Sequence, residues 1–441
     1  MKWSHHGDES MRLLQTADWH LGKKIYKQGM IEEHKAFLDW LLNIIIEKDV
    51  DVLLIPGDIF DSHTPSIDAY ELYYRFLSGI KDAHVHAVII TGNHDPSIRL
   101  NAPRDFLEMA NIHIIGGTRK SFQEYIVNLD INGERISFAA IPFLNEDDVL
   151  HHISFENDID RQLRYREAVR ILYKDCISTM PPDSIRILMG HFFINGSSLG
   201  NTERLIRIEN IQPVLVEDLL IGANYVAMGH VHRPQRVNVN DCPIVYSGSP
   251  IPLSFEEAEY DKKVFLIDID KSGKCDINYE KVPIFRELIR VEGTLDEILG
   301  YAKSEDWKDK YIEVTIKLNE PKIGMADNIR KAFLDRGGKA FVKFKFPNLN
   351  KNNHISVDDI KFKSPIDIFC DFYRNKFGED SSDKELDELI VTFSELLDIS
   401  KTEGDYNEHE MLDISKMRSN NNLSKDDDGE LEILDISKML P

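Results

Sequence analysis

The sequence has few cysteines and no long apolar run, and these absences exclude several classes of protein. Its four cysteines lie far apart and form no Cys-x-x-Cys pair, which disfavours a disulfide framework or a zinc ribbon and predicts reduced thiols. No stretch approaches the run of about 18 apolar residues that a membrane span requires. Residues 1–10 are polar, so we expect a disordered leader without a secretory signal. These features predict a cytoplasmic protein that has no membrane partner.

Positive charge is also scarce. The chain has 53 basic and 76 acidic residues and a formal net charge of -23, which at first sight disfavours a nucleic-acid partner. The excess is uneven, because residues 371–441 carry 20 acidic and eight basic side chains and so hold more than half of the net charge. Any affinity for DNA must therefore come from local basic patches or from a partner protein.

A repeated pattern of strand ends organises the chain. The clearest copy is LLIPGDIFD at 53–61, where a buried apolar run stops at a glycine and two aspartates follow. Four more apolar runs end in the same way, and they are LLQTADWH at 13–20, VIITGNHD at 88–95, IRILMGH at 185–191 and YVAMGHVH at 225–232. Helical periodicity at 31–48 and 68–78 separates the first three runs, which predicts a βαβαβ order and a largely parallel α/β sheet. Parallel strands present their carboxyl ends at one edge, so the polar residues should meet there.

The pattern also predicts a division of the chain. We expect a first domain at 11–275 and a smaller α+β domain at 276–372, which holds the best cluster of lysines and arginines. That cluster is either an ordinary solvated face or a surface for phosphates. In the remainder, 373–441, a helical stripe at 386–397 precedes an acidic tail with three LDISK copies. The copies are either a duplication within a disordered tail or short ligands for a partner surface.

The polar residues at the strand ends form a candidate ligand set for metal ions. Its members are Asp18, His20, Asp58, Asn93, His191, His230 and His232. The set has too much nitrogen for calcium or magnesium and lacks the thiolates of structural zinc, so it suits manganese, iron or zinc. Seven ligands exceed what one ion can use, which predicts two ions with Asp58 bridging them. Two cations about 3.5 to 4 Å apart suit the hydrolysis of phosphate esters. His94 would then act on the leaving-group side or hold the phosphate, with Asp61 fixing its tautomer through a hydrogen bond.

These motifs carry a resemblance to known enzymes. DxH, GDxxD, GNHD, GH and GHxH, in this order, resemble the signature of the calcineurin-like metallophosphoesterases over roughly residues 11–270. The segments PGDIFDSHTPS at 56–66 and YSGSPIPLSF at 246–255 narrow the resemblance to the SbcD family of nuclease subunits. The resemblance implies a four-layer β-sandwich flanked by helices, with 276–372 as a capping domain that helps to position DNA. It also implies a catalytic role for His94, which the superfamily pattern has Asp61 orient.

The same resemblance implies two Mn²⁺ ions and a partner. One ion would be held by residues matching Asp18, His20, Asp58 and His232, and the other by residues matching Asp58, Asn93, His191 and His230. The activity implied is that of a DNA exonuclease on double-stranded ends and an endonuclease on single strands and hairpins. The SbcC ATPase would bind 386–397 and form a heterotetramer of two subunits of each kind, at the nucleoid, in DNA repair, recombination and replication.

Two other functions are compatible with parts of the pattern. A phosphatase or small-substrate phosphodiesterase would use the same metal ligands and would act without a partner, a cap or a helical tail. A non-catalytic scaffold that binds DNA ends would keep the metals only for structure, and missing ligands would favour it. Every ligand of the signature is present in this sequence.

Overall fold

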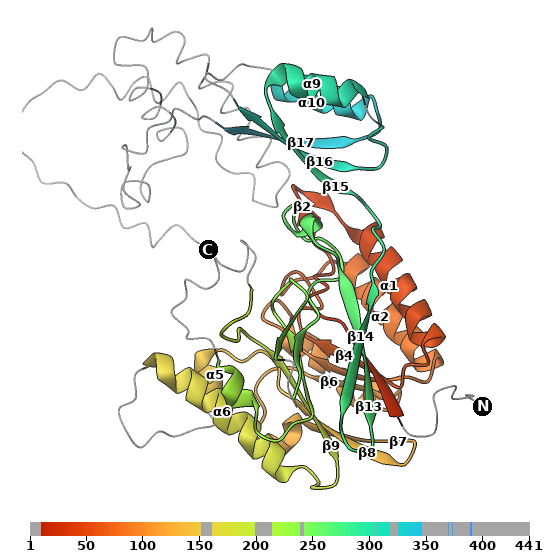
Figure 1. The fold of residues 1–441 in the computed structure, drawn as a ribbon, viewed down its shortest axis with the longest axis vertical. Coiled ribbons are helices and arrows are strands. Elements are labelled where there is room, and N and C mark those ends of the chain that lie inside the picture. Colours follow the sequence, from red (N-terminus) through yellow and green to blue (C-terminus); the bar gives the residue numbers. More distant parts are fainter. Residues whose placement is uncertain are drawn as a thin grey trace, which may run out of the picture. The chain divides into compact units, whose positions relative to one another are not determined.

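The computed structural model describes residues 10–150, 161–198, 214–238, 242–304, 306–317 and 325–345, with Phe369, Tyr373 and Leu389 (Figure 1). The chain divides into two compact units, Met1–Asn348 and Leu349–Pro441. The predicted leader at 1–10 lies outside the described residues except for Ser10, and the predicted segment 386–397 lies outside them except for Leu389. Within the described ranges, every helix is too short or too polar to cross a membrane.

A six-stranded sheet forms the first half of the larger unit. Its strands, in order across the sheet, are β14 (Cys275–Lys281), β13 (Lys263–Asp270), β1 (Ser10–Gln15), β4 (Val52–Pro56), β5 (His86–Ile90) and β6 (Ile112–Ile115). The last four are parallel, whereas β13 returns antiparallel to β1. Helices α1 (Ile31–Glu47) and α2 (Ile67–Asp82) pack on one face (Figure 1). Leu53 of β4 faces these helices and Leu54 faces the other way into a second core, which explains the unbroken apolar run.

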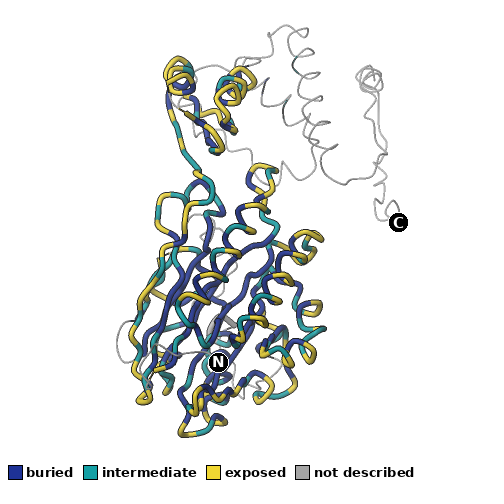
Figure 2. The backbone as a smooth tube through the Cα atoms, turned by 90° about the vertical axis from the view of Figure 1, so that its right-hand side faces the viewer, coloured by how far each residue is buried: buried dark blue, intermediate teal, exposed yellow. Residues whose placement is uncertain are grey.

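A second six-stranded sheet packs against the first. Its strands, in order, are β11 (Gln235–Asn238), β12 (Ile244–Tyr246), β10 (Tyr225–Gly229), β9 (Ile185–His191), β8 (Glu134–Ala140) and β7 (Ile126–Ile131). Helix α6 (Arg161–Thr179) contributes Leu172 and Tyr173 to its core. In Figure 2 the buried residues run along the strands of both sheets, and the exposed ones lie on the outer helices and loops. The predicted four-layer α/β fold is confirmed.

A smaller parallel sheet follows along the chain. It consists of β15 (Leu288–Gly293), β16 (Tyr311–Lys317) and β17 (Lys339–Lys345), and α9 (Leu295–Ser304) and α10 (Met325–Leu334) cover one face (Figure 1). Strand β14 pairs with β13 in the first large sheet, so the boundary predicted at 275 and 276 falls at the start of this strand. The division into domains stays a prediction.

Short elements connect these layers. They are β2 (Lys24–Ile25), β3 (Gln28–Gly29), α3 (Ser97–Asn101), α4 (Arg104–Glu108), η1 (Phe122–Tyr125), α5 (Glu146–Leu150), α8 (Val216–Leu219) and η2 (Glu257–Glu259). The β2–β3 hairpin meets the face of the small sheet opposite its helices. There the Tyr26 ring stacks on Phe341 with centroids 4.9 Å apart, and its hydroxyl donates to Glu313 Oε1 at 2.6 Å. The hairpin therefore fastens the small sheet to the large one.

Candidate metal centre

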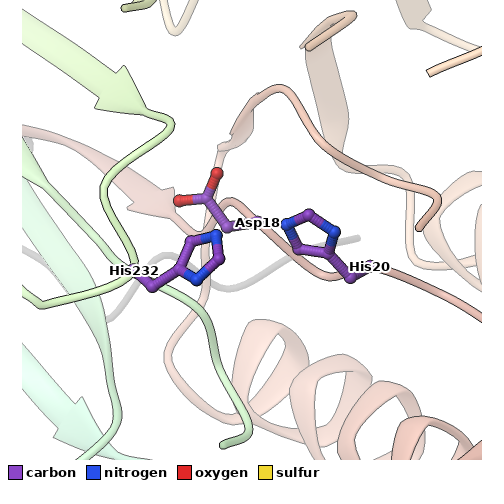
Figure 3. Close-up of side chains that lie close together, drawn as sticks. All are labelled: Asp18, His20 and His232. Carbon is purple, nitrogen blue, oxygen red and sulfur yellow. The ribbon is translucent and has the colours of Figure 1, made fainter. Parts of the chain in front are cut away.

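The structure brings the seven predicted ligands together where the two large sheets meet. Asp18, Asp58 and Asn93 follow β1, β4 and β5, and His191 ends β9. His230 and His232 follow β10. Donor atoms of Asp18, His20 and His232 lie within 4.8 Å of one another, and so do those of Asp58, His191 and His230. Asn93 joins the second group, because its Oδ1 lies 3.1 Å from His191 Nε2 and 3.0 Å from His230 Nδ1. Figure 3 shows the first group, in which His20 and His232 lie on either side of Asp18.

The Asp58 carboxylate lies between the two groups. Its Oδ2 is 3.5 Å from His20 Nε2 in the first group and 3.2 Å from His191 Nε2 in the second. Its Oδ1 accepts a hydrogen bond from the His94 main-chain N–H at 3.0 Å. One oxygen is thus fixed by the backbone, and the other can serve two sites at once.

The local backbone accounts for the residue types found at these strand ends. Asp18, His20, Asp58 and His230 all have positive φ, between 48° and 88°, a region that Asp and His tolerate better than most residues. Such conformations cost on the order of 1 to 3 kcal/mol each and persist where the surrounding structure holds them. A Cβ atom at Gly229 would lie 1.9 Å from the Pro56 carbonyl oxygen, so only glycine lets the two sheets approach this closely.

The buried donor atoms fit divalent cations. Asp18 Oδ2 and His20 Nε2 are buried and have no hydrogen-bond partner among the described residues. A buried carboxylate oxygen without a partner is costly, and a cation would remove that cost. Mixed carboxylate, amide and imidazole donors in two groups are a suitable set for two such ions.

Protonation in the metal-free state reflects this burial. Burial raises the pKa of Asp18 to about 7 and lowers the pKa of His20 to about 4. Burial also raises the pKa of Asp58, but His191 and His20 outweigh it and hold the value well below the ordinary range. For His191, burial lowers the pKa, yet the Asp58 carboxylate overcomes this effect and the result is about 9. Cations would compete with protons for these ligands.

His94 lies beside the first group, with its ring 4.9 Å from that of His20. Its Nδ1 is 3.0 Å from the main-chain oxygen of Asp61. The sequence predicts the Asp61 side chain for this contact, but that carboxylate lies 3.3 Å from His20 Nδ1 and 3.0 Å from Lys23 Nζ. A carbonyl oxygen only accepts, so Nδ1 of His94 carries a proton and Nε2 is the nitrogen left for chemistry.

Sequence reasoning missed two buried carboxylates that support the centre. Asp95 accepts from the main-chain N–H groups of Phe60 at 2.9 Å and Gly92 at 2.7 Å, and so ties together the loops after β4 and β5. Glu257 Oε1 lies 2.9 Å from His232 Nδ1. Asp95 is visible within the GNHD motif, whereas no pattern in the sequence marks Glu257.

Comparison with known proteins gives consistent matches. The family model for calcineurin-like phosphoesterases matches residues 11–234. The SbcD subunit of the nuclease SbcCD from Escherichia coli (strain K12) is 31% identical over 304 residues, which span 68% of this chain and 74% of that protein. The corresponding subunit of the nuclease SbcCD from Bacillus subtilis (strain 168) is 28% identical over 393 residues, 86% of this chain and 97% of that protein.

Proposed function

Because this chain belongs to the calcineurin-like phosphoesterases, and within them to the SbcD family, we propose that it is a manganese-dependent DNA nuclease that hydrolyses phosphodiesters by a two-metal mechanism. The observation that carries the proposal is the Asp58 carboxylate, whose Oδ2 lies within 3.5 Å of a histidine from each ligand group. When bound, two cations would polarise the phosphate and activate the attacking water.

The residues of the chain supply the remaining chemistry. His94 is held by its Nδ1 proton on the Asp61 carbonyl oxygen, at 3.0 Å, so its ring orientation is set before substrate binds. Once protonated on Nε2 as well, it can give that proton to the leaving oxygen and return to the neutral tautomer. Its main-chain N–H also holds Asp58 Oδ1, which couples the position of His94 to the carboxylate shared by the two groups.

The small sheet supports DNA as the substrate. The face opposite its helices carries Arg290 and four lysines against two glutamates, and these lysines are Lys317, Lys339, Lys343 and Lys345. Glu313 pairs with Lys343 at 2.7 Å and Glu292 with Lys317 at 3.1 Å, so positive charge remains in excess there. An excess of positive charge in a chain of net charge -23 favours contact with a phosphate backbone. We assign 276–372 to DNA positioning and double-strand exonuclease and single-strand or hairpin endonuclease activity to the protein.

The names of the relatives support an ATPase partner of the SbcC type. We propose that 386–397 binds this partner and that two copies of each subunit assemble at the nucleoid for DNA repair, recombination and replication. Self-association is supported by an apolar surface at 97–109, where Ile98 is 88%, Phe106 73% and Met109 85% exposed. Sedimentation of Phe106→Asp should show loss of the dimer that the wild type forms.

The decisive experiment is cleavage of a labelled DNA hairpin with Mn²⁺, with and without the ATPase and ATP. Wild-type cleavage should be lost in His94→Ala, while His84→Asn, at an exposed histidine outside the ligand groups, should cleave normally. Stimulation by the ATPase would support the partnership. Hydrolysis of a small phosphodiester without any DNA cleavage would instead support a small-substrate enzyme. Tight DNA binding without hydrolysis of either substrate would support a scaffold.

A further inference from the structure

A buried charged network lies behind His232. Glu257 and Lys262 have side chains only 6% and 5% exposed, and Lys262 Nζ donates to Glu257 Oε2 at 2.6 Å. The same oxygen accepts from Ser249 Oγ at 2.8 Å and from the Leu253 main-chain N–H at 3.3 Å. The other oxygen, Oε1, lies 2.9 Å from His232 Nδ1.

This arrangement determines which nitrogen of His232 carries a proton. The lysine and the two other donors favour the ionised form of Glu257, and an ionised carboxylate only accepts hydrogen bonds. His232 Nδ1 must therefore be the donor, and in the neutral ring Nε2 carries the lone pair. Nitrogen and oxygen donors of His232, Asp18 and His20 approach one another within 4.8 Å, so this lone pair belongs to the first ligand group.

The second ligand group is built differently. His191 Nδ1 lies 2.8 Å from the main-chain oxygen of Pro56, a neutral acceptor. In the first group His20 Nδ1 faces the Asp61 carboxylate, which pairs with Lys23, and His232 Nδ1 faces Glu257, which pairs with Lys262. The Asp61 and Lys23 side chains are 26% and 30% exposed, so the buried Glu257 pair is the less screened of the two.

We propose that Glu257 is a positioning residue for His232 and that, held by Lys262 and Ser249, it sets the metal affinity of the first ligand group alone. A carboxylate behind a metal-binding histidine fixes the ring and raises the basicity of the ligating nitrogen, and loss of such a partner typically costs about 10- to 100-fold in metal affinity. The inference rests on the proposed two-metal function and adds an asymmetry. Among the described residues, the hydrogen bonds of the Glu257 carboxylate reach His232 of the first group and no ligand of the second.

The test is a titration of the full, metal-stripped chain with Mn²⁺, followed by electron paramagnetic resonance. The principal variant is the double change Glu257→Leu with Lys262→Met, which removes both buried charges and leaves neither uncompensated. We expect one of the two ions to bind about 10- to 100-fold more weakly and the other to bind as in the wild type. Glu256→Gln is the control, because this neighbouring carboxylate is exposed and pairs with Arg290 at 3.2 Å.

A second measurement does not depend on metal or activity. Nitrogen-15 spectra of histidine-labelled, metal-stripped protein report the tautomer of His232, whose signal is identified by its absence in His232→Asn. The wild type should show the Nδ1-protonated form, and the double variant should show a mixture. Glu257→Gln keeps an acceptor for the Nδ1 proton, so it should retain the tautomer and lose affinity only in part, and it serves as the second variant if the double variant does not fold.

The outcomes separate this inference from the proposed function. Wild-type protein that binds fewer than two Mn²⁺ ions would overturn both. Wild-type protein that binds two ions, with unchanged affinities and tautomer in the double variant, would overturn the role of Glu257 alone. Equal weakening of both ions would overturn the asymmetry.

Discussion

Gly92→Ala is the sharpest test of how the centre is packed. A Cβ atom at residue 92 would lie 2.1 Å from Asp58 Oδ1 and 2.4 Å from the Asp58 main-chain nitrogen. Both are more than 1 Å closer than an ordinary contact of about 3.5 Å. The carboxylate cannot simply rotate, because Oδ1 accepts from the His94 N–H and the backbone nitrogen would still clash.

The expected magnitude follows from this geometry. The loops after β4 and β5 must separate by about 1 Å, which breaks the hydrogen bonds by which Asp95 joins Phe60 and Gly92. Overpacking of this kind costs about 1 to 3 kcal/mol of unfolding free energy. A displacement of about 1 Å at catalytic groups can cost about 100-fold in rate. Gly92→Ala should therefore lose at least about 100-fold in DNA cleavage while remaining largely folded.

Urea denaturation, Mn²⁺ titration and hairpin cleavage together test this reasoning. Gly300→Ala is a matched control, because residue 300 is exposed within α9 and no described atom lies within 4 Å of a Cβ built there. That control should gain about 0.5 to 1 kcal/mol of stability, since alanine is the better helix former, and it should cleave normally. Wild-type metal binding and cleavage in Gly92→Ala would refute the argument.

Removing the metal should lower Tm, because each ion present at 100 times its Kd contributes about 2.7 kcal/mol to stability; calorimetry with EDTA and with added Mn²⁺ measures this, and a Tm insensitive to both would contradict it. In metal-free protein, the pKa of Asp18 is raised from 3.8 to about 7, so the folded state holds a proton that the unfolded state releases. The stability of the wild type relative to Asp18→Asn should therefore fall as the pH rises from about 4 to 7, by at most about 1.4 kcal/mol per pH unit, and a rise would refute this sign. Tyr26→Ala removes the stack on Phe341 and the hydrogen bond to Glu313, which should speed hydrogen exchange in β17 but leave β4 unchanged; equal exchange in both strands would contradict this docking role.

The strand ends could be predicted because their signal is local. Each is an apolar run that stops at a small residue, and parallel pairing of β1, β4 and β5 places their carboxyl ends at one edge. Helices α3 and α4 were missed, since each spans only five residues and has no room for helical periodicity. The antiparallel return of β13 to β1 joins residues more than 240 positions apart, and nothing in either strand encodes that pairing. The sequence alone therefore identifies the edge but not the strand that closes the sheet beside it.

The contacts behind the ligands could not be predicted, and Asp61 shows why. This residue offers His94 two acceptors, a carboxylate and a main-chain oxygen, and sequence spacing does not distinguish them. Lys23 and His20 take the carboxylate, at 3.0 and 3.3 Å, which leaves the main-chain oxygen for His94. The choice therefore depends on a lysine that carries no motif of its own. For Asp61→Asn, this predicts that the hydrogen bond to His94 survives while the contacts with Lys23 and His20 weaken. Metal affinity should therefore fall more than the orientation of His94 changes, and an altered His94 tautomer with normal Mn²⁺ binding would favour the side-chain role instead.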